Sequence, residues 1–221
     1  MNAYLLGALV FGWCVPYVAR RFAKFMPATL AGALVETVRW QKKAKGYRST
    51  LKYRQFLWRS LMMGVGCAAV TQIGFEHFGA ENFWVVAFYL WMLLLMAEVD
   101  YRTYLLPDIL TVPLLLVGFL VSSLDIGFVS YGESAVGAML GYFLPVAVSL
   151  LIVWRDKDAF GGGDVKLLAA LGAWLGVYGV LYVILSASVL GLLYAFVKKK
   201  KSLAFGPMIA LAGMIVALCF Y

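Results

Sequence analysis

Long apolar runs occupy most of this sequence, and they limit the folds that the chain can adopt. A helix needs roughly 20 residues to cross the hydrocarbon core of a bilayer, and most of the runs approach that length. We therefore predict an all-α, polytopic membrane protein with about eight transmembrane helices. The runs lie at residues 2–19, 55–75, 82–99, 108–124, 134–154, 164–179, 180–197 and 203–221.

Composition supports the same class. Hydrophobic residues make up 64% of the chain and charged residues 14%, whereas soluble domains carry roughly 25% charged residues. The first apolar run has no basic segment before it and no Ala-x-Ala-like cleavage site after it. We expect it to be a membrane helix rather than a cleaved signal peptide.

The basic residues indicate the orientation of the chain in the membrane. All 19 Lys and Arg residues lie in or beside connections that eight helices would place on one face. The opposite connections carry acids and no Lys or Arg. Because cytoplasmic loops are enriched in Lys and Arg, the basic face is predicted to be cytoplasmic and both termini to lie outside. This topology accounts for the net charge of +8, so no nucleic-acid partner is expected.

One basic cytoplasmic loop, residues 20–54, is the sizeable soluble segment of the predicted topology. Within it, Met26 to Trp40 could form an amphipathic helix that lies on anionic lipid. Membrane lipids are therefore expected partners of this loop, and contact with a substrate or cosubstrate remains an alternative.

Two aspartates are the candidates for chemistry. Asp100 ends the third predicted helix, and Asp164 stands between Gly161–Gly163 and the sixth. The topology puts both at similar depth on the cytoplasmic face. Two carboxylates in contact cannot both ionise easily, so one keeps a proton. The charged one could take a proton from water while the neutral one hydrogen-bonds a scissile carbonyl, as in aspartic proteases. The glycines would let an extended substrate strand approach.

A structural alternative exists for each acid. Either aspartate could cap a helix or pair with a cation such as Lys166. Asp108 rivals Asp100, but it follows Pro107 and precedes an apolar run, so we predict a helix N-cap with Thr111 at the third helical position. Lys166 could tune the pair of aspartates or meet lipid phosphate.

Three stretches resemble the type IV prepilin peptidases, a family of membrane aspartic proteases that includes relatives trimming archaeal preflagellins. The first, residues 99–111, is similar to the family's catalytic Asp followed by a Leu-Pro-Asp/Asn-x-x-Thr helix start. The second, residues 161–167, matches its Gly-x-Gly-Asp-x-Lys motif. The third, residues 205–211, is similar to a Phe-Gly-Pro segment that opens the family's last helix.

The resemblance implies an aspartic endopeptidase of the bacterial inner membrane with its active site on the cytoplasmic side. Asp100 and Asp164 would be the catalytic pair, and the substrates would be type IV prepilins or pseudopilins, cut after a glycine. Peptidase activity needs no cofactor. The site would be shaped by Gly161, Gly162, Gly163, Lys166, Pro107 and Asp108.

The N-terminal part departs from the family's commonest pattern. Many members also methylate the new N-terminus with S-adenosylmethionine, and their cytoplasmic loop carries paired Cys-x-x-Cys motifs suited to zinc. This chain has three cysteines without that spacing, so zinc is not expected and methyl transfer stays open. We divide the chain into a reduced N-terminal region, residues 1–54, and a membrane peptidase domain, residues 55–221.

Two other classes of protein are compatible with many apolar helices. A transporter or channel could use the aspartates to bind cations or relay protons, although no acid lies in the middle of a predicted span. A scaffold of a pilus or secretion machine could keep the motifs without activity. Leader removal from a prepilin separates these classes, and the sequence leaves the oligomeric state open.

Overall fold

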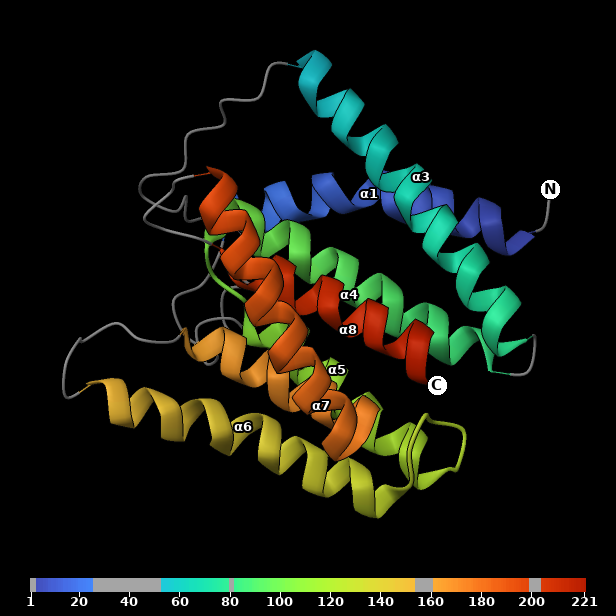
Figure 1. Cartoon of the computed structure of the whole chain (residues 1–221). Helices are drawn as coiled ribbons and strands as arrows, with labels where there is room; N and C mark the ends of the chain where they lie inside the picture. The colour runs from blue at the N-terminus through green and yellow to red at the C-terminus, as the bar shows by residue number, and fades with distance from the viewer. Residues whose placement is uncertain (1–2, 26–52, 80–81, 154–160, 199–203) are drawn as a thin grey trace. The chain divides into compact units, whose positions relative to one another are not determined.

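The computed structural model describes residues 3–25, 53–79, 82–153, 161–198 and 204–221. In these ranges every regular element is an α-helix, as predicted (Figure 1). The helices are α1 (Ala3–Phe25), α3 (Tyr53–Phe78), α4 (Phe83–Thr103), α5 (Asp108–Ser123), α6 (Tyr131–Val153), α7 (Gly162–Lys198) and α8 (Gly206–Phe220). The predicted helix at Met26 to Trp40 lies outside the described residues.

Five of these helices are long and apolar enough to cross a bilayer: α1, α3, α4, α6 and α7. Helices α5 and α8 are also apolar but shorter, with 16 and 15 residues. An all-helical chain with several such helices is a polytopic membrane protein, because only a membrane satisfies this much exposed apolar surface. The chain divides into two compact units, Met1–Thr103 and Tyr104–Tyr221, which are described separately.

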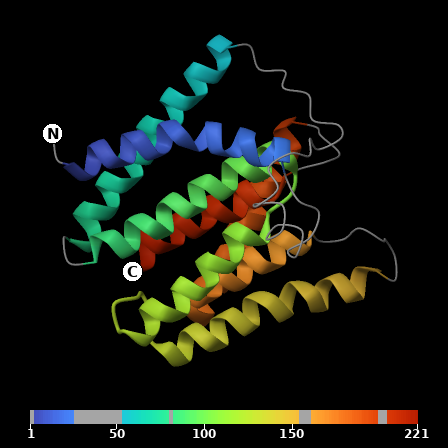
Figure 2. The same ribbon diagram turned by 180° about the vertical axis from the view of Figure 1, so that it is seen from behind.

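The first unit contains α1, α3 and α4. Helices α1 and α3 cross each other in both views (Figures 1 and 2). Aromatic contacts join α1 to α4, where the rings of Phe11 and Trp91 stack with centroids 4.8 Å apart. The Trp91 indole N–H also donates to Thr71 Oγ1 of α3 at 2.8 Å. One tryptophan thus connects all three helices through its ring faces and its polar edge.

The second unit contains α5, α6, α7 and α8. Helices α6 and α7 pack backbone to backbone, because Gly137 and Gly172 each occupy space that a Cβ atom would take from the other helix. Trp174 of α7 is fully buried, and its N–H donates to the Leu114 carbonyl of α5 at 2.8 Å. The glycines permit the close approach of α6 and α7, and the Trp174 side chain fills space between α7 and α5.

Helix α7 is interrupted at Gly176. This residue has φ 65° and ψ −166°, a conformation that only glycine adopts readily. The part before it packs against α6, and the part after it turns toward the start of α8 (Figure 1). The sequence predicted two helices here, divided between residues 179 and 180. The structure moves the division to Gly176.

The motif segments start helices where the sequence predicted them. Helix α5 begins after Pro107, α7 begins within the glycine run, and α8 begins at Gly206 with proline in its first turn. One detail was wrong. Pro107 is the N-cap of α5, so Asp108 is its first helical residue and makes no side-chain cap. The Pro107 carbonyl accepts from the amides of Leu110 and Thr111, and the Asp108 carboxylate is engaged elsewhere.

Candidate active site

Asp100 lies in the last turn of α4 and is 4% exposed. The turn is closed by a hydrogen bond from Thr103 Oγ1 to the Val99 carbonyl at 2.8 Å. The next residue, Tyr104, has φ 55°, a left-handed conformation that cannot continue a right-handed helix. Asp100 therefore lies three residues before the point where α4 stops abruptly.

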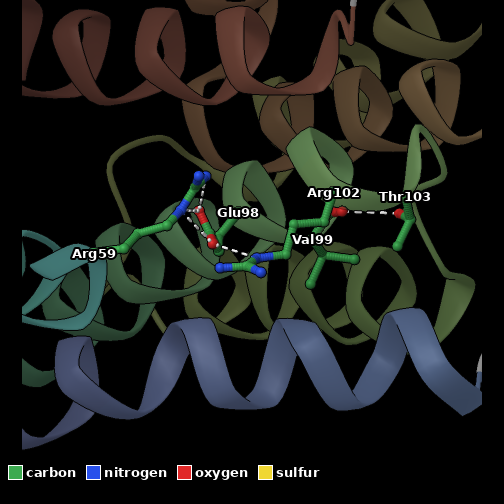
Figure 3. Close-up of polar contacts among 5 residues, drawn as sticks. All are labelled: Arg59, Glu98, Val99, Arg102 and Thr103. Carbon is green, nitrogen blue, oxygen red and sulfur yellow. Dashed lines mark hydrogen bonds and ion pairs between the residues drawn. The ribbon is translucent and has the colours of Figure 1, made fainter. Parts of the chain in front are cut away.

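Three ionic side chains surround the same turn (Figure 3). Arg59 of α3 holds Glu98 through two nitrogens, with Nε 2.9 Å from Oε1 and Nη2 2.8 Å from Oε2. Arg102, one turn after Glu98, donates its Nε to Oε1 at 2.5 Å. Tyr101 also contributes, because the Arg59 guanidinium lies 4.5 Å from the centre of its ring.

The spacing of Glu98 and Arg102 is the helical i,i+4 spacing, so their contact was readable from the sequence. The sequence predicts only a topological role for both arginines. Arg59 could not be assigned from sequence because it is 39 residues away from Glu98.

Asp164 lies in the first turn of α7. The Gly161 carbonyl accepts from the amides of Asp164 and Val165, at 3.0 and 3.3 Å, which makes Gly161 the N-cap residue. A carboxylate at this position is stabilised by the unpaired amides and the dipole of the helix N-terminus. One of its oxygens, Oδ2, lies 3.1 Å from where a Cβ of residue 161 would stand. Glycine therefore leaves room for the carboxylate.

The other two glycines have different surroundings. A Cβ on Gly163 would lie 2.7 Å from Leu106 Cβ and 3.0 Å from the Leu106 carbonyl oxygen. A Cβ on Gly162 would meet nothing within 4 Å. Gly163 thus allows the start of α7 to approach the segment that leads into α5, and Gly162 faces open space.

Lys166 and Asp108 form an ion pair, with Nζ 2.5 Å from Oδ1. The pair joins the N-terminal part of α7 to the first turn of α5, whose N-cap is Pro107. Both side chains are partly exposed, at 44% and 19%. The sequence did not predict Asp108 as the partner of Lys166.

Most of the predicted site-shaping residues therefore come together in the second unit. Leu106 touches Gly163, and Asp108 pairs with Lys166, so the segment before α5 lies against the start of α7. Asp164 belongs to this unit and Asp100 to the other. The pairing of the two aspartates stays a prediction.

Comparison with known proteins assigns the chain to a family. Residues 87–196, which include Asp100 and Asp164, match the model of the type IV leader peptidase family. A protein of Xanthomonas campestris pv. campestris named prepilin leader peptidase/N-methyltransferase is 38% identical over 71% of this chain and 56% of its own length. Proteins of the same name from Dichelobacter nodosus and Aeromonas hydrophila are 33% and 41% identical, over 72% and 58% of this chain.

The similarity covers part of each relative. The Dichelobacter and Aeromonas proteins are matched over 57% and 47% of their lengths, so the chain spans about half the length of the curated relatives it matches. No solved structure is significantly similar to the chain. The matched region begins within α4 and ends near the end of α7, and it holds both motif aspartates. Through residues 87–196, the chain belongs to the type IV leader peptidase family.

Proposed function

We propose that this chain is a membrane aspartic endopeptidase that removes the short basic leader of type IV prepilins or pseudopilins. The observation that carries the proposal is that Asp100 and Asp164 both fall inside the family region, each in the terminal turn of a membrane helix. Helix ends at a membrane surface give water and an extended peptide access to a carboxylate. The names of the relatives support the same substrate class.

The proposed chemistry uses the two carboxylates as a proton-sharing pair. The charged carboxylate takes a proton from water while the water oxygen attacks the carbonyl carbon of the peptide bond. The neutral carboxylic acid gives its proton to the carbonyl oxygen, which avoids a free oxyanion. When the tetrahedral intermediate collapses, the C–N bond breaks and the leaving amine takes a proton from the carboxyl group that was protonated by water. One hydroxyl of the intermediate gives its proton to the other carboxylate, which restores the pair. This sequence requires no metal ion or cofactor.

The proposed topology has eight membrane crossings and places the site on the cytoplasmic side of the inner membrane. Helix α7 supports the count. Its 37 residues would extend about 55 Å as one straight helix, almost twice the roughly 30 Å of the hydrocarbon core. If the chain reverses at Gly176, Asp164 and Lys198 lie on the same face, with every other Lys and Arg.

Leader removal tests the proposal directly. The protein is expressed with a prepilin, and the shift from precursor to mature pilin is followed on a gel. Asp100→Asn and Asp164→Asn are each expected to lower processing at least about 100-fold, because neither half of the pair works alone. Asp125→Asn is the matched control, since Asp125 is an exposed loop residue after α5.

Retention of processing by both variants would exclude the peptidase mechanism and favour a transporter or a scaffold. If Asp108→Asn abolishes processing and Asp100→Asn does not, the first catalytic aspartate is Asp108. The Lys166 ion pair predicts the opposite, because Asp108 already has a cationic partner.

A second activity, N-methylation of the new N-terminus, is favoured by one observation, which is the name of the relatives. S-adenosylmethionine would be the methyl donor. Mass spectrometry of the mature pilin from the same assay detects this activity. A pilin that is heavier by one methyl group only when this chain is present would establish it, and an unmodified pilin would restrict the chain to proteolysis.

A further inference from the structure

Arg59, Glu98 and Arg102 form a cluster that we call the α3–α4 ion triad. Glu98 is 4% exposed, and the side chains of Arg102 and Arg59 are 7% and 29% exposed. Both Glu98 oxygens accept from guanidinium groups, at 2.5 to 3.2 Å. Removing charges from water in this way is costly, so a buried triad of this kind is weak evidence for stability alone.

The place of the triad suggests what it does. Glu98 precedes Asp100 and Arg102 follows it near the end of α4, and Arg59 reaches Glu98 from α3 (Figure 3). The last turns of helices fray because their carbonyls have no partners within the helix. A catalytic side chain must be held within roughly 0.5 Å of its working position. A tie from the last turn to a neighbouring helix opposes fraying at the position where Asp100 lies.

We propose that the α3–α4 ion triad positions Asp100, with Arg59, Glu98 and Arg102 as positioning residues. Glu98 anchors the end of α4 to α3 through Arg59, and Arg102 connects the last turn of α4 to Glu98. Thr103 closes the same turn through the Val99 carbonyl. The inference rests on the proposed peptidase function. It adds Arg59 and Glu98, which lie outside the motifs that carry the family resemblance, and it gives a role to Arg102 within the first motif.

The test compares Arg59→Gln with Arg59→Lys in the full-length protein. Arg59→Gln removes the anchor from α3, so kcat for leader removal should fall about 10- to 100-fold. KM should change less than about twofold, because substrate binding elsewhere is unaltered. Arg59→Lys keeps the charge but loses the two-nitrogen contact, and it should recover part of kcat. Rates are expressed per folded molecule, which removes the contribution of misfolded protein.

Glu76→Gln is the matched control. It also replaces a charged side chain of α3 by glutamine, but Glu76 is at the other end of α3 and accepts from Gln72 rather than from an arginine. Its kcat and KM should equal those of the wild type.

Hydrogen exchange gives a second readout that needs no substrate. The amides of residues 99–103 should exchange about 10-fold faster in Arg59→Gln, while those in the middle of α4 keep their wild-type rates. Unchanged exchange in this turn, or wild-type kcat per folded Arg59→Gln molecule, would overturn the positioning role. If Arg59→Gln does not fold, Arg59→Lys and Arg102→Lys give the same comparison.

The two hypotheses fail separately. If the wild type removes no leader, the peptidase proposal is wrong, and if Asp100→Asn still removes it, Asp100 is not a catalytic residue. In either case, exchange in α4 alone decides whether the triad holds the last turn of that helix. If Asp100→Asn is inactive and Arg59→Gln is fully active, only the positioning role is wrong.

Discussion

At the scale of single residues, Gly162 and Gly163 give a sharp comparison. An alanine at position 163 would place its Cβ 2.7 Å from Leu106 Cβ and 3.0 Å from the Leu106 carbonyl oxygen. Gly163→Ala should therefore destabilise the protein by about 1–3 kcal/mol, because backbone must move. Gly162→Ala should stay within about 0.5 kcal/mol of the wild type, since nothing lies within 4 Å of the added atom. Thermal unfolding in detergent measures both.

The same two residues explain a feature of the motif. In Gly-x-Gly-Asp-x-Lys, the variable position corresponds to Gly162, which faces open space. The fixed glycines correspond to Gly161, which leaves room for the Asp164 carboxylate, and Gly163, which contacts Leu106. Equal stability of Gly163→Ala and Gly162→Ala would show that this packing does not explain the pattern.

The sequence predicted these site residues better than it predicted their partners. A motif marks Asp164 and Lys166, but nothing in it states that Lys166 meets Asp108, which lies 58 residues earlier. Glu98 lies outside the motifs, and its Arg59 partner belongs to another helix. Such contacts depend on how helices pack, and a single sequence does not show which distant segments pack together. The helix starts were predictable because proline and glycine mark them locally, whatever the helices pack against.

At the scale of helices, Gly176 determines how α7 is divided. Its φ of 65° and ψ of −166° are accessible to glycine and strained for any residue with a Cβ. Gly176→Ala should cost about 1–3 kcal/mol in unfolding free energy. Gly132→Ala is the control, because Gly132 is in the first turn of α6 and has nothing within 4 Å of an added Cβ.

Denaturant unfolding in mixed micelles compares the two variants. If Gly176→Ala is as stable as the wild type, α7 does not need the break. The sequence predicted two helices because each of the apolar runs, 164–179 and 180–197, approaches the length of one crossing. It misplaced the division by a few residues because the interruption is a single glycine within an otherwise apolar segment.

At the scale of the whole molecule, the path of α7 decides the number of membrane crossings. The proposed topology places the Gly176 break at the outer face, so residues just after it meet water. A single long crossing would instead bury the middle of α7 in hydrocarbon. Tyr178 is 75% exposed and lies two residues after the break, which makes it the position where the two arrangements differ most.

A cysteine-labelling experiment separates these arrangements. In a background with Cys14, Cys67 and Cys219 replaced by alanine, Tyr178→Cys should react in intact cells with a maleimide that does not cross the membrane. Leu185→Cys is the matched control, because Leu185 is also exposed, at 64%, but lies two turns further into the second part of α7. It should not react, because thiolate formation and reagent access both require water.

Reaction at residue 178 from outside, without reaction at residue 185, requires α7 to cross the membrane twice. Asp164 and Lys198 then share one face, and the remaining basic residues identify that face as cytoplasmic. Protection of both residues would make α7 one tilted crossing and put Asp164 and Lys198 on opposite faces. Asp164 and the four lysines at 198–201 could not then both be cytoplasmic, and the charge-based orientation would be wrong.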